Sequence, residues 1–249
     1  STVQQPPATP AVSPWAEWIE PDFPFFSSVL NAGRAGPGLP TRNLTPRGLI
    51  VNLGQGHWVA FDTDLLRVAA VWRGNAVTPK ALAPGSYHEP DRKTQGGQSP
   101  PEPDGKVWAA NGIYPGWQAG ARPSLDDPRE PAPTVEEVGR GPVSDQIGRF
   151  GAVRLVRGGV VLEYTVRGAD VREWMTVASA GGRSAIVRNV QIGPTAEPLW
   201  MMAGFKAKEG SISFCPGTGA ALALESIAAS GGAAEPALAL KVPAHSQPV

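Results

Sequence analysis

Apolar and polar side chains alternate along the second half of the chain, with glycine-rich turns between the alternating runs. A period of two places successive side chains on opposite faces, as in a strand with one buried face. The alternating runs are 150–156, 160–166, 171–177 and 184–192. Strands that recur at this spacing with short turns predict an antiparallel β-sandwich or meander rather than βαβ units.

The first half of the chain opens with two apolar runs, at 48–53 and 57–62, split by Gly-Gln-Gly. This arrangement predicts a β-hairpin. The run 65–72 could be a strand or a short helix, and its length and β-branched residues favour a strand. Four later segments complete the expected set of strands: 199–205, 211–214, 221–227 and 237–242.

A long stretch at 74–147, rich in proline, glycine and aromatic residues, separates the early strands from the late ones. Prolines recur through it, so we expect no uninterrupted helix or central strand there. Its rings, Tyr87, Trp108, Tyr114 and Trp117, argue against disorder, because disordered tracts are poor in aromatics. We therefore expect an ordered insertion that its aromatic side chains hold against the sheets.

The predicted organisation is one mainly β domain: an antiparallel β-sandwich over 23–244 with the insertion inside it. Residues 1–22, proline-rich at their start, form an expected flexible N-terminal segment, and 245–249 form a linker-like tail. The opening residues are typical of the start of a mature exported protein or of a boundary cut from a longer chain. The expected location is therefore periplasmic or secreted.

The composition narrows the function classes. The 249 residues include 22 Lys+Arg and 22 Asp+Glu, a net charge of +0, and contain no basic run with interleaved aromatics. We therefore expect no nucleic acid as a partner. No apolar stretch is long enough to predict a membrane span. The single cysteine, Cys215, excludes an internal disulfide or Cys-pair zinc site in this chain, and we expect it to be a small buried hydrophobe.

Asp62 and Asp64 form the first candidate site. Carboxylates at i and i+2 on a strand point the same way, about 7 Å apart, and could bind a hard cation such as Ca²⁺. The same side chains could instead cap a turn or pair with Arg67. Calcium is the one cofactor that the sequence suggests, and only through this pair.

A proline-bounded loop supplies the second candidate. It brings Tyr87, His88, Glu89 and Arg92 within a few positions. His88 could act as a general base or a metal ligand, with Glu89 as its catalytic partner and Tyr87 and Arg92 contacting substrate. A solvated, turn-forming loop explains the same residues.

The third candidate lies further along the insertion, in Trp108, Asn111, Tyr114 and Trp117. Aromatic rings stack on the apolar face of a sugar while amides bond its hydroxyls. These residues therefore predict a shallow aromatic surface that binds a glycan. The competing interpretation is that the rings hold the insertion against the sheet.

Several segments resemble an uncharacterised exported domain of planctomycete, verrucomicrobial and acidobacterial proteins. They are 23–30, 43–48, 61–67, 83–88 and 111–117, and the resemblance extends over most of the chain from about residue 23. In those proteins the domain is similar to an N-terminal module that precedes a sorbosone-dehydrogenase-like β-propeller and, in many, a c-type cytochrome. The resemblance implies an accessory module of a larger periplasmic oxidoreductase system. It supplies no catalytic residues.

Three functional hypotheses follow. The first is an exported non-catalytic module that binds a glycan or docks against another domain of a larger polypeptide. The second is a carbohydrate-active enzyme, a hydrolase or lyase, in which His88 meets Asp62, Asp64 or Glu89 in a deep cleft. The third is a structural calcium-bound sandwich. The sequence leaves open whether the chain is an enzyme.

Overall fold

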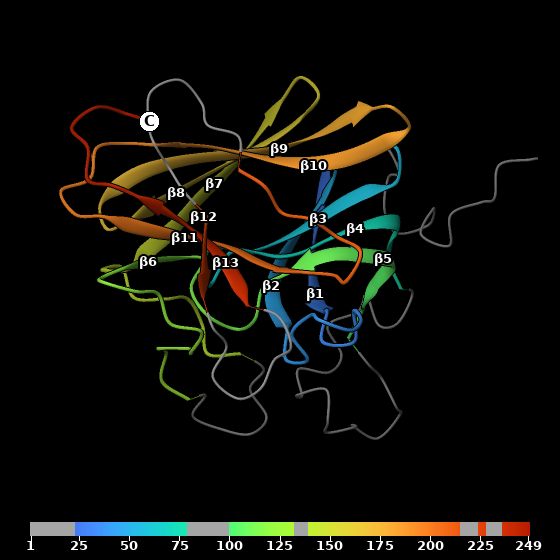
Figure 1. Cartoon of the computed structure of the whole chain (residues 1–249), viewed down its shortest axis with the longest axis horizontal. Coiled ribbons are helices and arrows are strands. Elements are labelled where there is room, and N and C mark those ends of the chain that lie inside the picture. Colours follow the sequence, from blue (N-terminus) through green and yellow to red (C-terminus); the bar gives the residue numbers. More distant parts are fainter. Residues whose placement is uncertain (1–22, 79–99, 132–138, 215–223, 228–235) are drawn as a thin grey trace, which may run out of the picture.

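The computed structural model describes residues 23–78, 100–131, 139–214, 224–227 and 236–249. Every regular element among them is a β-strand, and the strands form two antiparallel sheets (Figure 1). The predicted antiparallel β-sandwich is confirmed. The part of the chain that the structure describes contains no helix long and apolar enough to cross a membrane.

The smaller sheet is a four-stranded meander in the order β10-β9-β8-β7. Its strands are β7 (Gly148–Val156), β8 (Gly159–Val166), β9 (Ala169–Ala180) and β10 (Arg183–Ile192). These strands carry the alternating runs, and consecutive strands pair through the short glycine turns between them. Figure 1 shows this sheet lying across the top of the larger one.

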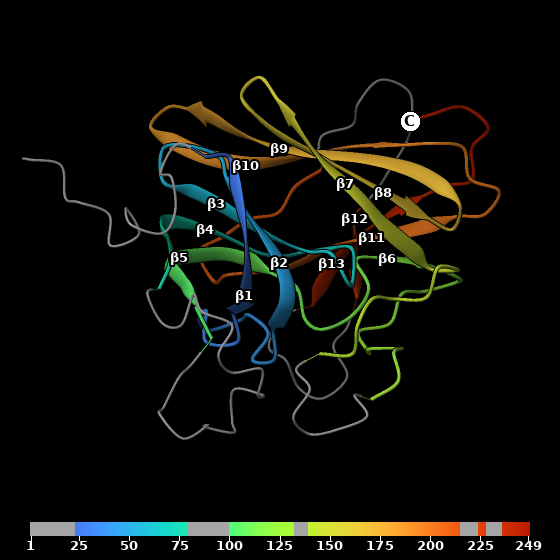
Figure 2. The ribbon, with the colours of Figure 1, turned by 180° about the vertical axis from the view of Figure 1, so that it is seen from behind.

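The larger sheet has nine strands in the order β1-β2-β3-β4-β5-β11-β13-β12, with β6 beside β11. Its strands are β1 (Phe25–Asn31), β2 (Leu44–Asn52), β3 (His57–Asp62), β4 (Arg67–Val77), β5 (Pro103–Ala110), β6 (Trp117–Ala119), β11 (Leu199–Lys206), β12 (Leu224–Ile227) and β13 (Ala237–Val242). Figure 2 shows β1 to β5 on one side of the molecule and β6 with β11 to β13 on the other.

The main core lies between the two sheets. Leu162 and Val171 of the smaller sheet pack in one cluster with Val59 and Phe61 of the larger sheet. The ring centroids of Phe61 and Tyr164 lie 5.6 Å apart across this interface. The smaller sheet therefore buries one face and exposes the other, which is why its strands alternate in sequence.

A second core covers the opposite face of the larger sheet. Ile50, Ala60 and Trp72 belong to it, and Leu39 and Leu125 from flanking loops pack with them. Because residues 49–51 of β2 and 59–61 of β3 are buried on both faces, these stretches are continuously apolar where β8 and β9 alternate.

The predicted hairpin of β2 and β3 is confirmed. The third strand is also confirmed, but β4 begins at Arg67 rather than residue 65 and continues to Val77. The residues before it form a tight turn in which Leu66 adopts a left-handed backbone conformation, with φ of 50°. That conformation is incompatible with a strand and delays the start of β4.

The insertion holds two strands, and the expectation that it would contain no central strand is wrong. β5 lies between β4 and β11. Pro103 is the first residue of β5, where a missing N–H is tolerated, and no proline follows until Pro115. The short strand β6 pairs with β11.

The last predicted strands are only partly confirmed. β13 matches its predicted range of 237–242, whereas 211–214 is not a strand. Of 221–227, the strand β12 covers Leu224–Ile227 and the rest lies outside the described residues. The C-terminal tail is hydrogen-bonded to the body: Val249 exchanges two backbone bonds with Ile192.

Candidate functional site

Asp62 lies at the end of β3, at the start of the tight turn. Its Oδ1 accepts the backbone N–H groups of Asp64 and Leu65, at 3.0 and 3.3 Å. Its Oδ2 accepts Nε of Arg67 at 3.0 Å, and both side chains are essentially fully buried. Asp62 thus caps the turn and pairs with Arg67, as one of the two sequence interpretations expected.

Asp64 lies beside the same turn, and its Oδ1 is 2.8 Å from Nε of Arg47. Ca²⁺ takes six to eight oxygen ligands, whereas each of these carboxylates already faces a guanidinium. No cluster of three or more His, Cys, Asp or Glu suited to a metal occurs among the described residues. The arrangement therefore does not fit a calcium site at Asp62 and Asp64.

Asp64→Asn is expected to raise the melting temperature at pH 7 and to have less effect near pH 4. Burial and then the charge of Asp62 raise the pKa of Asp64 above its ordinary value of 3.8, despite Arg47. A carboxyl with a raised folded pKa favours the folded state at acid pH and loses that contribution as pH rises through the raised pKa. Asparagine carries no charge and removes this loss.

Melting curves between pH 3.5 and 7 test this expectation. The exposed Asp145→Asn variant serves as the control. A difference between Asp64→Asn and the native protein that grows toward acid pH would contradict it.

The segment from Asn111 to Trp117 anchors the insertion inside the protein. Nδ2 of Asn111 donates to the backbone oxygen of Val68 at 2.8 Å, and its Oδ1 accepts the hydroxyl of Tyr114 at 2.8 Å. Burial raises the pKa of Tyr114 to about 12, so its hydroxyl stays protonated as a donor. A Cβ at Gly116 would lie 2.1 Å from the backbone oxygen of Leu66, so only glycine allows this close approach.

The shallow aromatic surface expected around Trp108, Tyr114 and Trp117 does not form. Tyr114 and Trp117 are buried, as is Asn111. Trp108 is half-buried, with its ring 5.4 Å from that of His57. These rings hold the insertion against the sheets, in line with the competing interpretation, and sugar binding by them stays a prediction.

The proposed catalytic loop cannot be placed. Tyr87, His88, Glu89 and Arg92 lie outside the described residues. The enzyme hypothesis that depends on them stays a prediction.

The sequence interpretation missed a buried polar network between the two sheets. Nε1 of Trp117 donates to the hydroxyl of Tyr164 at 2.9 Å, and that hydroxyl donates to Oε2 of Glu173. Arg188 binds Glu173 through Nε and, at 3.1 Å, through Nη2. Nη1 of Arg188 reaches the backbone oxygen of Met202 in the larger sheet at 3.2 Å.

Electrostatics keep two members of this network, Tyr164 and Arg188, protonated. Burial and then the charge of Glu173 raise the pKa of Tyr164 well above its usual value. Burial alone would lower the pKa of Arg188, but Glu173 outweighs it and raises that pKa. The strand alternation carried a signal, because Glu173 and Arg188 share the inward phase of Val171 and Ile186.

The outer face of the smaller sheet presents a different set of side chains. Trp174 of β9 is 36% exposed and is the only exposed tryptophan among the described residues. Asn189 of β10 lies directly opposite it, and Gln191 lies opposite Arg172. Two cross-strand pairs of polar and aromatic side chains therefore lie next to each other, about 7 Å apart along the strands.

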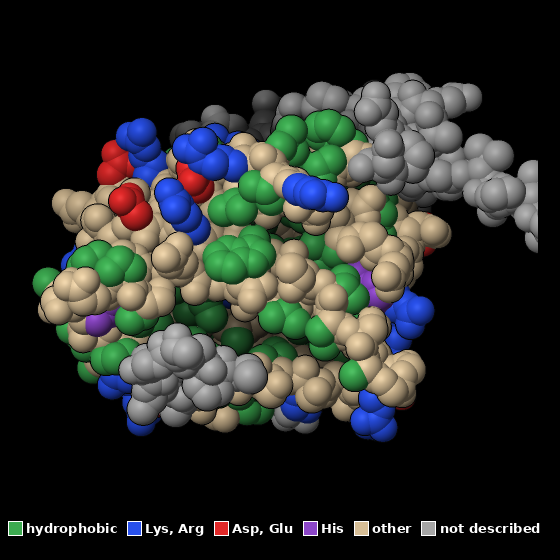
Figure 3. All heavy atoms as spheres, turned by 90° about the horizontal axis from the view of Figure 1, so that it is seen from above, with side chains coloured by type: hydrophobic (Ala, Val, Ile, Leu, Met, Phe, Trp, Pro, Cys, Tyr) green, Lys and Arg blue, Asp and Glu red, His purple; other side chains and the backbone are tan. Residues whose placement is uncertain are grey.

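Charged side chains extend this face across β8 and β7. Nε of Arg154 lies 2.7 Å from Glu163, and Nε of Arg172 lies 3.4 Å from the same carboxylate. Arg154 lowers the pKa of Glu163 by hydrogen bonding, so the carboxylate is ionised at neutral pH. Figure 3 looks down on this face: apolar side chains lie near its centre, with Lys and Arg as well as Asp and Glu side chains around them.

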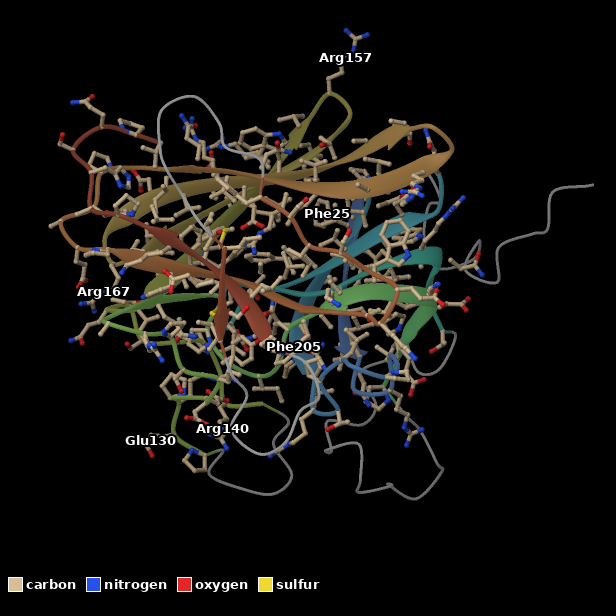
Figure 4. All side chains as sticks on the ribbon, viewed as in Figure 1. Phe25, Glu130, Arg140, Arg157, Arg167 and Phe205 are labelled. Atoms are coloured by element: carbon tan, nitrogen blue, oxygen red, sulfur yellow. The ribbon has the colours of Figure 1, made fainter. Side chains whose placement is uncertain are left out.

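A hollow of about 510 Å³ lies at another part of the surface, beside β6. Gln118 and Ser124 line it and bond each other, with Nε2 of Gln118 2.8 Å from the backbone oxygen of Ser124. Arg167 and Glu197 also line the hollow, and Nε of Arg167 pairs with Glu197 at 2.8 Å. Figure 4 shows Arg167 on the side of the molecule where β6 lies. Because these polar groups bond one another, the hollow is a weaker candidate than the outer face.

The signal for Trp174 was present in the sequence. In the run from 171 to 177, Val171, Glu173 and Met175 occupy one phase, and Arg172, Trp174 and Thr176 occupy the other. A tryptophan in phase with arginine and threonine indicates the solvent face.

Comparison with known families gives one result. Residues 59–173 match the family model DUF6797, a domain of unknown function. The matched DUF6797 segment begins in β3 and ends at Glu173 in β9, so it contains Arg67, the insertion and the pair Arg154–Glu163. No curated protein and no solved structure matches the chain.

Proposed function

We propose that this chain is a glycan-binding module and that its site is the outer face of the β7–β10 sheet. The observation that carries the proposal is Trp174, an exposed ring on the outer face of the sheet with Asn189 opposite it on the neighbouring strand. We propose this face rather than the rings of the insertion, because Tyr114 and Trp117 are buried and Trp108 is half-buried.

The face has the two kinds of group that sugar binding requires. The ring of Trp174 offers an apolar surface on which a sugar ring can stack. Nδ2 of Asn189 makes only long contacts within the protein, including 3.3 Å to the backbone oxygen of Trp174, and such contacts are weak. The amide can therefore turn toward a sugar hydroxyl at little cost.

The module would act outside the cytoplasm as an accessory part of a larger periplasmic oxidoreductase system. The support for this setting is the resemblance of the segments at 23–30, 61–67 and 111–117 to an exported N-terminal domain. If no glycan binds, the alternative function is docking against another domain of a larger polypeptide.

Trp174→Ala is expected to weaken glycan binding by about 2 kcal/mol, roughly thirtyfold in Kd, as for a central aromatic anchor. Native electrophoresis in gels that contain one plant or microbial polysaccharide each identifies a ligand through retarded migration. Calorimetry with the retained polysaccharide then compares the native protein with Trp174→Ala.

The matched control is Trp108→Ala, which removes a half-buried ring of the larger sheet. Circular dichroism establishes that both variants are folded. The proposed site would be contradicted if Trp174→Ala kept the native affinity, or if only Trp108→Ala lost affinity. If no polysaccharide bound, the proposal that the chain is a glycan-binding module would be contradicted.

A further inference from the structure

We infer that the glycan is acidic, a polysaccharide that carries carboxylate or sulfate groups. This inference rests on the proposed function and names the ligand class of the same face. Two observations support it. The face carries an excess of positive charge, unlike the chain as a whole, and part of that charge lies beside Trp174.

The smaller sheet carries an excess of positive charge at its surface, although the whole chain has a net charge of +0. Its exposed or half-buried ionic side chains, apart from Arg167 with its partner Glu197 and Arg188 with its buried partner Glu173, are Arg149, Arg154, Arg157, Arg172, Arg183, Glu163 and Asp170. Arginines outnumber acids in this set. Figure 4 shows Arg157 projecting from the tip of the β7–β8 turn.

The arginines nearest to the ring are only partly neutralised. Arg154 and Arg172 share the single carboxylate of Glu163, and each arginine side chain remains 64% exposed. Arg172 is two residues from Trp174 on β9, so its side chain lies on the same face about 7 Å away. A sugar stacked on Trp174 would therefore carry its substituents toward a guanidinium.

A guanidinium suits a carboxylate or sulfate better than a hydroxyl. Its planar fork of N–H donors binds such groups through two parallel, charge-assisted bonds. A neutral glycan would use the ring and the amide but leave the excess charge without a partner. The face therefore favours an acidic ligand over a neutral one of the same backbone.

Single-stranded nucleic acid is the other polyanion to consider. Proteins that bind it stack successive bases on several aromatic side chains. Trp174 is the only exposed tryptophan in the described part of the chain. One ring among arginines favours a polysaccharide, which would combine a single stacked sugar with charged contacts instead of repeated stacking.

The test compares the affinity of the native protein for four probes: polygalacturonate, dextran sulfate, neutral dextran and oligothymidylate. We expect each acidic polysaccharide to bind at least about tenfold more tightly than dextran, and its affinity to fall with added salt because surface charges are screened. The two acidic probes separate carboxylate from sulfate as the preferred group.

Charge variants locate the effect. Arg172→Gln is expected to weaken binding of the preferred acidic probe about fivefold, and Glu163→Gln to strengthen it about threefold by freeing both arginines, within the range of exposed charge pairs. The control is Arg34→Gln, an arginine that is 76% exposed in the loop after β1. It should leave the affinity unchanged.

The possible outcomes distinguish the inference of an acidic ligand from the proposal of glycan binding on which it rests. Equal, Trp174-dependent binding of neutral and acidic polysaccharides would overturn the acidic ligand and leave glycan binding intact. Binding of oligothymidylate as tight as that of the acidic probes, or weaker binding by Glu163→Gln, would also overturn it. Binding of no polysaccharide would overturn both.

Discussion

Replacing Arg67 by methionine is expected to lower the free energy of unfolding by about 3–5 kcal/mol, the usual cost of breaking a buried ion pair from one side. Arg67 is fully buried. Without it, Asp62 would keep a buried charge with only the N–H groups of Asp64 and Leu65 as partners.

The loss extends beyond the ion pair, because Arg67 joins three segments. Its Nη1 donates to the backbone oxygens of Asn111, at 3.0 Å, and Gly112. Its Nη2 reaches Oγ1 of Thr45 on β2 at 3.3 Å. The side chain therefore joins β2, the turn before β4 and the residues that follow β5, and methionine would remove its hydrogen bonds to the backbone oxygens of Asn111 and Gly112.

Urea unfolding followed by fluorescence measures the change. The exposed Arg34→Met is the control and should alter the free energy of unfolding by less than about 0.5 kcal/mol. The double variant Asp62→Asn/Arg67→Met should be more stable than Arg67→Met alone, because it removes the buried charge. A cost below about 1 kcal/mol for Arg67→Met would contradict the structural role of the pair.

Glu173→Gln is expected to cost about 3 kcal/mol, the second large effect. Glu173 is fully buried and holds both the hydroxyl of Tyr164 and the guanidinium of Arg188. Glutamine preserves the shape but removes the charge that balances Arg188. The guanidinium of Arg188, whose side chain is 16% exposed, would then keep its bond to the backbone of Met202 without a counter-charge.

Tyr164→Phe is the matched comparison, because it removes a neutral member of the same network. It should cost about 1–3 kcal/mol, since it leaves Nε1 of Trp117 without its acceptor. Thermal and urea unfolding of both variants give the order of the two effects. A larger loss for Tyr164→Phe than for Glu173→Gln would show that the ion pair is not the dominant contribution.

The strands of the smaller sheet could be predicted because only one of its faces is buried. Alternation in 160–166 and 171–177 follows directly from that burial. The strands of the insertion were harder to predict, because a strand such as β5 depends on neighbours that are distant in sequence, here β11. It also pairs with β4, on the far side of residues 78–102. Proline lies at the start of β5, at Pro103, and does not prevent the strand from forming.

The candidate site was predicted less well, for a physical reason. The segment Asn111–Trp117 combines amides, rings and glycines, and this combination serves a tightly packed insertion as well as a sugar platform. Only the three-dimensional structure shows that its ring Trp117 faces Tyr164 rather than solvent. The phase of β9 could have identified Trp174 as an exposed ring, and its pairing with Asn189 required the register of β9 against β10.

The most direct test of the glycan-binding face is an NMR titration of the tryptophan indole N–H signals. The chain has eight tryptophans, and Trp174→Phe, Trp108→Phe and Trp117→Phe assign the three signals that matter. On addition of an oligosaccharide from the polysaccharide that binds best, the Trp174 signal should shift. The signals of Trp108 and of Trp117, which is bonded to Tyr164, should stay in place. A shift of Trp108 or Trp117 with Trp174 unchanged would contradict the assignment of the site.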